Sequence, residues 1–299
     1  MNIGFVILIA QRKDLGRPPT YNEIRTMALL AEESGFDSIW LYDHLLYRPT
    51  GEPTIGIWEC WTILSALAEA TKRIELGTLV LCSSFRNPAI LAKMAHTLDE
   101  VSQGRFIFGI GAGWNKPEYD AFGLPFDHRV ARFEEALKII KPLLKSGHVD
   151  FDGQYYQARD CEITPRGPRE GGPPLPIGSF GPKMLKLTAQ YADLWNTAYL
   201  DGPESLNEPL AKIQEACETV GRAPSTLSVT AAVALAFPDL AQPPAFMESY
   251  LTGSTGEIAQ AMKGYEEMGV SHLMFHCSPY NEESLARLAA ATAAYREME

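Results

Sequence analysis

The chain has 299 residues, of which 46% are hydrophobic, and its formal net charge at pH 7 is −11. This length and apolar content suffice for one large hydrophobic core or for two domains of ordinary size. The acidic balance and the lack of a long basic run argue against nucleic acid as a partner, and no apolar run approaches the ~18 residues of a transmembrane helix.

The five cysteines are scattered through the chain and form no CxxC motif. We therefore predict neither a metal site nor a disulfide framework. Reduced cysteines favour a cytoplasmic protein. The apolar run from Met1 to Ile9 lacks a basic region and a small-residue cleavage site, so it predicts a first strand rather than a signal peptide.

Hydrophobic periodicity predicts strands and helices in regular alternation. The first strand covers 2–9, and a helix over 21–34 follows, with Thr20 and Glu23 placed as a capping box. Further strands are expected at 38–42, 74–81, 105–110, 175–178, 193–197, 227–236 and 272–275, the last with His276 at its end. Further helices are expected at 59–71, 88–102, 117–122, 130–144, 182–191, 204–220, 254–268 and 282–298.

Eight strands that alternate with helices indicate parallel strands joined by right-handed crossovers. The pattern predicts one (β/α)8 TIM barrel domain over residues 1–299, with insertions after the fourth and seventh strands. A doubly wound open sheet is the alternative. Against it, no GxGxxG motif opens the first helix, and the eight units show no second-domain signature.

The fourth predicted strand carries glycines at alternate positions: Gly109, Gly111 and Gly113. Alternate residues of a strand share a face, so this face has no side chains and admits close approach of another backbone or a flat ligand. A flexible strand-to-helix turn explains the same spacing. Trp114 and Asn115 end the run.

In such a barrel the active site lies at the carboxyl ends of the strands. The groups there are mostly small, glycine-rich and aromatic, which suits a flat ring system better than a sugar diphosphate or a metal. Asp43 and His44 follow the second strand and form a candidate proton-handling pair, although an Asp that caps a loop and a His that packs would look the same. The segment 178–181 precedes a helix and fits a phosphate site or an ordinary turn equally well.

Several of these segments together resemble the luciferase-like monooxygenase superfamily of flavin- and F420-dependent enzymes. The similar segments follow one another in order over nearly the whole chain: Asp43-His44, Arg86-Asn87-Pro88, 102–106, 109–114, 122–126, 150–156 and 191–196. The superfamily is a (β/α)8 barrel that binds FMN or the deazaflavin coenzyme F420. The compact length and the pair Trp114-Asn115 make the F420-dependent branch the most similar.

The resemblance implies a role for each matching residue. His44 would be the catalytic group over the reacting face. Leu79-Val80 would form an apolar bulge behind the ring, often through a non-prolyl cis peptide. The cofactor-binding residues would be Asp43, Leu79, Val80, Gly111, Ala112, Gly113, Asn115, Ser179, Phe180 and Gly181, the last three at the cofactor phosphate.

We accordingly expect an oxidoreductase that moves a hydride between F420 and a small organic substrate. A reduced-FMN-dependent monooxygenase is the alternative, and a non-catalytic flavin-binding protein is an alternative of another class. The sugar-phosphate dehydrogenases of the superfamily carry an acidic residue where this chain has Trp114, so we do not expect glucose 6-phosphate as the substrate. We also expect a homodimer.

Overall fold

The computed structural model describes residues 1–12, 15–244 and 247–298, and its fold is α/β. The chain divides into two compact units. Unit 1 comprises Met1–Leu8, Thr26–Trp40 and Gly178–Glu299. Unit 2 comprises Ile9–Arg25 and Leu41–Ile177.

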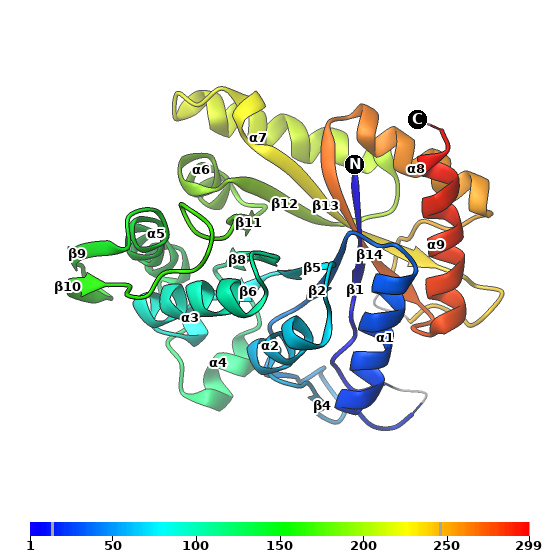
Figure 1. Cartoon of the computed structure of the whole chain (residues 1–299), viewed down its shortest axis with the longest axis horizontal. Coiled ribbons are helices and arrows are strands. Elements are labelled where there is room, and N and C mark those ends of the chain that lie inside the picture. The colour runs from blue at the N-terminus through cyan, green and yellow to red at the C-terminus, as the bar shows by residue number, and fades with distance from the viewer. Residues whose placement is uncertain (13–14, 245–246, 299) are drawn as a thin grey trace. The chain divides into compact units, whose positions relative to one another are not determined.

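Unit 1 is built on parallel strands in the order β12–β13–β14–β1–β2 (Figure 1). Their bounds are Leu194–Leu200 for β12, Ser228–Ala236 for β13, Val270–Ser278 for β14, Asn2–Val6 for β1 and Ser38–Leu41 for β2. Gly4 of β1 pairs with Met274 on one side and Ser38 on the other. A Cβ atom on Gly4 would overlap the Ser38 hydroxyl, so the close strand approach requires glycine here.

Helices connect and cover these strands. They are α1 (Tyr21–Glu33), which begins in unit 2, α6 (Pro182–Tyr191), α7 (Asn207–Thr219), α8 (Thr255–Glu267) and α9 (Glu282–Arg296), with 3-10 turns at Pro203–Leu206 and Pro224–Thr226. In Figure 1, α8 and α9 lie side by side. Ser254 and Glu257 form a capping box that starts α8, and Pro182 occupies the first turn of α6.

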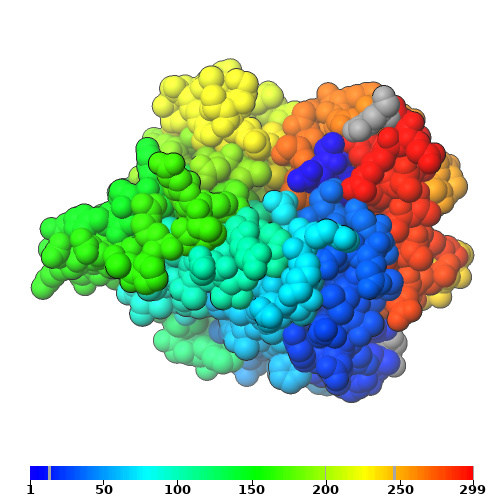
Figure 2. All heavy atoms as spheres, viewed as in Figure 1, coloured from blue at the N-terminus to red at the C-terminus, as the bar shows by residue number. Residues whose placement is uncertain are grey.

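Unit 2 holds short parallel strands and two antiparallel pairs. β5 (Glu75–Thr78) pairs with β7 (Phe106–Ile107), and β8 (Ile110–Gly111) lies between β6 (Leu81–Cys82) and β11 (Pro176–Gly178), whose last residue belongs to unit 1. The antiparallel pairs are β3 (Leu46–Tyr47) with β4 (Ile55–Gly56), and β9 (His148–Asp152) with β10 (Gln157–Glu162). The β9–β10 hairpin projects beyond α5 (Figures 1 and 2).

The helices of unit 2 are α2 (Cys60–Ala70), α3 (Pro88–Val101), α4 (Lys116–Phe122) and α5 (Arg129–Lys145), with a 3-10 turn at Ser83–Phe85. Local sequence explains where two of them start. The Glu59 carboxylate accepts the backbone N–H groups of Trp61 and Thr62 at the start of α2, and the Asn87 side chain caps α3 just before Pro88.

Every predicted strand and helix has a counterpart in the structure, and the Thr20–Glu23 capping box is confirmed by its hydrogen bonds. Three details of the prediction were wrong. The fourth strand is broken in two, the β3–β4 pair was missed, and β14 runs to Ser278, so His276 lies within a strand and not at its end. The third strand is also broken, at the Leu79–Val80 bulge that the family resemblance implies. Residues 245–246 of the predicted proline-containing segment lie outside the described residues.

The breaks in the third and fourth strands have a common cause. Gly109 lies so close to the backbone of Thr78 that a Cβ atom would overlap the Thr78 carbonyl. The Gly109 carbonyl accepts the Thr78 hydroxyl at 2.7 Å and the Leu81 backbone N–H at 2.9 Å. These contacts replace regular ladder pairing at that point, and alternation of apolar residues alone does not predict them.

Candidate active site

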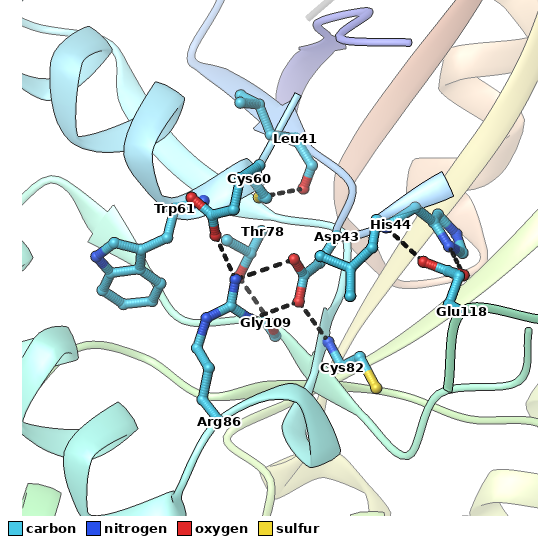
Figure 3. Close-up of polar contacts among 12 residues, drawn as sticks. Leu41, Asp43, His44, Cys60, Trp61, Thr78, Cys82, Arg86, Gly109 and Glu118 are labelled. Atoms are coloured by element: carbon cyan, nitrogen blue, oxygen red, sulfur yellow. Dashed lines mark hydrogen bonds and ion pairs between the residues drawn. The ribbon is translucent and has the colours of Figure 1, made fainter. Parts of the chain in front are cut away.

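Asp43, directly after β2, is a buried carboxylate that is held by an arginine (Figure 3). Arg86 binds it through two nitrogens, with Nη1 2.7 Å from Oδ2 and Nη2 3.1 Å from Oδ1. The backbone N–H of Cys82 donates to Oδ2 at 3.0 Å. Burial raises the pKa of the Asp43 carboxyl, and the hydrogen bonds and charge of Arg86 oppose that rise.

Arg86 has a second carboxylate partner in Glu59, so one guanidinium joins Asp43 to the start of α2. The same three groups tie the segment after β2 to the turn after β6. A bidentate arginine fixes geometry as well as charge. Asp43 therefore has a structural role in this unit, and its predicted contact with a cofactor ring stays a prediction.

His44 turns to a different partner. Its Nδ1 lies 2.7 Å from Oε1 of Glu118, on α4 (Figure 3). The His44 side chain is 14% exposed, whereas the Glu118 side chain is 1% exposed. Oε2 of Glu118 also accepts the backbone N–H of Leu45, at 2.5 Å. A buried carboxylate thus holds both the imidazole and the backbone that follows it.

Asn115 completes this arrangement from the start of α4. Its side-chain amide donates to Oε1 of Glu118 and, at 3.0 Å, to the Leu46 carbonyl. The sequence predicts Asn115 as a cofactor-binding residue, which stays a prediction. The structure adds that its amide links the His44 segment to Glu118.

Aromatic rings flank the His44 imidazole. The ring centroid of Tyr47 lies 4.5 Å from that of His44, and the Trp114 indole meets the imidazole edge-on at 5.6 Å. Trp114 is 61% exposed. An imidazole bordered by two such rings faces an environment in which an uncharged organic group can bind.

The Leu79–Val80 peptide lies in the gap between β5 and β6 and is cis, as predicted. Both side chains are partly exposed. The backbone N–H of Leu79 donates to the Leu41 carbonyl at 2.8 Å, and Cys82 pairs with Gly111 of β8. An apolar, partly exposed turn therefore lies beside the chain that leads into Asp43 and His44.

Close packing within this unit explains why two of the three alternate positions are glycine. Gly109 approaches Thr78, as described above. Gly113 has a φ of +74°, and a Cβ atom on it would overlap the Tyr119 hydroxyl and the Cys82 sulfur, which lie 3.0 Å apart. The predicted roles of Gly111, Ala112 and Gly113 along a cofactor stay predictions.

The predicted phosphate-binding residues lie in unit 1, before α6. The Ser179 hydroxyl is buried and bonded to the Thr188 hydroxyl at 2.8 Å, so it is already satisfied. Phe180 is exposed, and an added Cβ on Gly181 would meet no atom within 4 Å. Open space at Gly181 leaves the backbone of this turn accessible to an anion, and the predicted role of these residues stays a prediction.

Sequence analysis missed Glu118 and the pairing role of Glu59. Glu118 lies 74 positions from His44, in the short helix that the sequence predicts over 117–122. No local pattern signals a partner at that distance. Within the described ranges, no group of three or more His, Cys, Asp or Glu residues could hold a metal ion.

Comparison with known families places the chain among proteins described as luciferase-like monooxygenases, whose family pattern matches residues 1–242. Because that match covers most of the chain, the chain belongs to the luciferase-like monooxygenase family. No helix in the described part of the chain is both long and apolar enough to cross a membrane.

Among individual relatives, the F420-dependent glucose-6-phosphate dehydrogenase of Amycolatopsis mediterranei (strain U-32) is 38% identical over 173 residues, which is 56% of this chain and 50% of that protein. The enzyme of the same name from Kineococcus radiotolerans is 27% identical over an alignment of 311 residues that covers 88% of each chain. The match thus spans only half of the first of these relatives.

A solved structure of an F420-dependent secondary alcohol dehydrogenase, in complex with an F420–acetone adduct, has the same fold. It superposes with a TM-score of 0.81 at 23% identity and covers 99% of both chains. At this identity the similarity establishes the fold alone.

Proposed function

We propose that this protein is an oxidoreductase that transfers a hydride between coenzyme F420 and a carbon of a small organic substrate. We place the reaction at the carboxyl ends of strands that close into one (β/α)8 barrel. The observation that carries the proposal is the His44 imidazole, which is partly exposed and bound at Nδ1 by Glu118. The segment that leads into His44 is joined to the apolar cis Leu79–Val80 turn, because the Leu41 carbonyl accepts the backbone N–H of Leu79. Relatives that are named for F420 support the choice of cofactor.

The residues of unit 2 fit a flat ring system. Leu79 and Val80 offer partly exposed apolar groups, and Gly111 on the neighbouring strand β8 adds no side chain. Such a wall needs no polar side chain to be desolvated when a ring binds. Leu79, Val80, Gly111 and Ala112 would hold the ring, and Ser179, Phe180 and Gly181 would approach the cofactor phosphate.

When bound, F420 supplies a ring carbon, C5, that accepts or donates a hydride. The chain would accept or return the proton. When an alcohol is oxidised and its carbinol carbon gives the hydride to the cofactor, Nε2 of His44 would accept the hydroxyl proton. In the reverse direction Nε2 would return that proton to the carbonyl oxygen.

Separate titrations of the purified protein with F420 and FMN test this proposal, followed by turnover assays with small alcohols and ketones. We expect tight binding of F420 and a change of F420 absorbance that depends on the alcohol. Binding of FMN alone, with oxygen-dependent product formation, would support a monooxygenase instead. Binding without turnover under either condition would support a non-catalytic flavin-binding protein.

The Gly111→Val variant sharpens the test of the ring site. A branched side chain on this strand should abolish binding of F420, while circular dichroism shows a folded protein. Normal affinity in the variant would mean that the ring does not lie against β8. A Gly256→Val variant, on α8, where an added Cβ would meet no atom within 4 Å, serves as the matched control.

We also propose that the protein acts on a small molecule as a cytoplasmic homodimer. Light scattering of the purified protein measures the mass in solution. A mass near 33.0 kDa would indicate a monomer and contradict this part of the proposal.

A further inference from the structure

We propose that Glu118 is a positioning residue that keeps the neutral His44 imidazole in the tautomer with its hydrogen on Nδ1. Nε2 is then the nitrogen that exchanges a proton with the substrate. The catalytic consequence rests on the proposed function. The tautomer itself is a property of the protein without cofactor or substrate, so it can be tested separately.

The hydrogen-bond partners of Glu118 are donors. The backbone N–H of Leu45 and the side-chain amide of Asn115 can only donate to it. The ionised carboxylate, which only accepts, matches this set. Nδ1 of His44 must then carry the hydrogen that fills the 2.7 Å contact with Oε1.

The Glu118 carboxylate is also fixed in orientation by hydrogen bonds to both of its oxygens. Oε2 is held by the N–H of Leu45, and Oε1 is held by Asn115, whose amide is itself anchored on the Leu46 carbonyl at 3.0 Å. Glu118 thus binds the segment His44–Leu45 at two points, the His44 imidazole and the Leu45 backbone N–H. Fixing an imidazole by a hydrogen bond to one nitrogen determines what the other nitrogen can do.

The opposite edge of the ring is the accessible one. His44 keeps 14% exposure, and its hydrogen bond to Glu118 uses Nδ1. Tyr47 and Trp114 border the imidazole. The partly exposed edge that carries Nε2 is therefore the one available to a substrate hydroxyl or carbonyl.

Glu118→Gln is a specific test because an amide cannot accept everywhere that a carboxylate does. If its NH2 group faces Leu45, two donors meet. If the NH2 group faces Asn115 and His44, it clashes with the Asn115 amide but can donate to an unprotonated Nδ1. The second orientation favours the other tautomer of His44, with the hydrogen on Nε2.

The direct experiment is NMR of protein labelled with 15N-histidine, without cofactor, with His44 assigned from the spectrum of His44→Gln. In the neutral ring of the wild type we expect Nδ1 protonated and Nε2 unprotonated. In Glu118→Gln we expect this pattern to be lost or reversed. A wild-type His44 with its hydrogen on Nε2 would overturn the proposal, even if F420 binds and turns over.

Glu135→Gln is the matched control. Glu135 also accepts backbone N–H groups, from Gln154, Tyr155 and Tyr156, and its partners lie in the hairpin region of the same unit. The His44 pattern should be unchanged in this variant. A change equal to that of Glu118→Gln would show that the effect is a general response to charge loss, and the proposal would fail.

Kinetics then tests the consequence. Glu118→Gln should lower kcat about 10²-fold and leave the affinity for F420 within about threefold, because the proton transfer is affected and the ring site is not. Glu118→Asp keeps the charge and should restore part of kcat. A purely structural role would instead lower the folded fraction and leave the kcat of the folded protein unchanged in both variants. Absence of any turnover in the wild type would refute the proposed function and leave the NMR result standing.

Discussion

Asp43 and His44 are neighbours in the sequence, yet they belong to two different kinds of environment. Asp43 is buried and compensated by Arg86, with the Cys82 N–H as a further donor. His44 is partly exposed and held at one nitrogen by Glu118. The pair is therefore not a single proton-handling unit: each side chain has its own charged partner, on a different helix or turn.

The difference shows how one short loop combines rigidity with reactivity. The Asp43–Arg86 pair fixes the backbone, since breaking it would leave a buried charge. The His44–Glu118 pair fixes a ring and leaves one of its nitrogens accessible. Changes in the Asp43 environment should therefore act on stability, and changes in the His44 environment should act on turnover.

The largest expected effect follows from Arg86→Met. Removing the guanidinium leaves the Asp43 carboxylate buried without its counter-charge, which should lower the free energy of unfolding by about 3–5 kcal/mol. Urea denaturation monitored by circular dichroism measures it. The double variant Asp43→Leu with Arg86→Met should recover most of the loss, and a double variant as unstable as the single one would contradict this explanation.

The same variant has a predictable response to pH. The folded-state pKa of Asp43 is raised above its ordinary value of 3.8, so protonation of this group favours the folded state. Without Arg86 that rise is no longer opposed. The free energy of unfolding of Arg86→Met should therefore approach that of the wild type as the pH falls from 7 toward 4. A difference in unfolding free energy that does not change with pH would argue against a buried charge.

The His44→Ala variant should have the next largest effect, and this effect should be on turnover and not on stability. We expect kcat to fall by about 10²-fold or more because the proton acceptor is lost. The affinity for F420 should stay within about tenfold, and the free energy of unfolding within about 1 kcal/mol. Unchanged kcat at saturating substrate would remove His44 from the mechanism.

His272 extends the comparison to unit 1, as a buried histidine whose hydrogen-bond partner is an uncharged hydroxyl. Its Nε2 lies 2.6 Å from the Ser38 hydroxyl, which accepts the Trp40 indole N–H. Burial lowers the pKa of His272 to about 4. Since the unfolded chain binds this proton more readily, stability should be lost as the pH falls from about 6.5 toward 4, by about 3 kcal/mol at most.

Comparison with His272→Gln isolates that contribution. The free energy of unfolding of each protein is measured at several pH values between 7 and 4. The wild type should lose more stability over this interval than the variant does. Parallel curves for the two proteins would mean that other groups account for the acid sensitivity.

The sequence predicted the elements well because each one is encoded locally. Alternation of strands and helices, the Thr20–Glu23 box and Pro182 at a helix start are properties of short windows. Periodicity alone did not predict the breaks in the third and fourth strands, since they depend on one segment approaching another, and the bulge at Leu79–Val80 was expected only from the family resemblance. The closure of the strands into a ring and the single domain stay predictions.

The candidate site was predictable only in part for the same reason. His44 was found because it follows a strand, and the cis Leu79–Val80 peptide because it accompanies the family resemblance. Glu118 and Glu59 carry no local signal: their partners lie 74 and 27 positions away. Which side chain each carboxylate faces is determined by tertiary packing, and a single sequence does not contain that information in readable form.

Trp114→Ala should have the smallest effect and tests the aromatic border of His44. Trp114 is 61% exposed, so its truncation should change the free energy of unfolding by no more than about 0.5 kcal/mol. An aromatic contact with a substrate is worth about 0.5–1.5 kcal/mol, so KM should rise about three- to tenfold for a ring-bearing alcohol or ketone, with kcat nearly unchanged. A short-chain alcohol that cannot reach the indole should show no such rise. The ring centroids of Trp114 and His44 lie 5.6 Å apart. An equal change of KM for both substrates would therefore mean that Trp114 acts by positioning His44 and not by contact with the substrate.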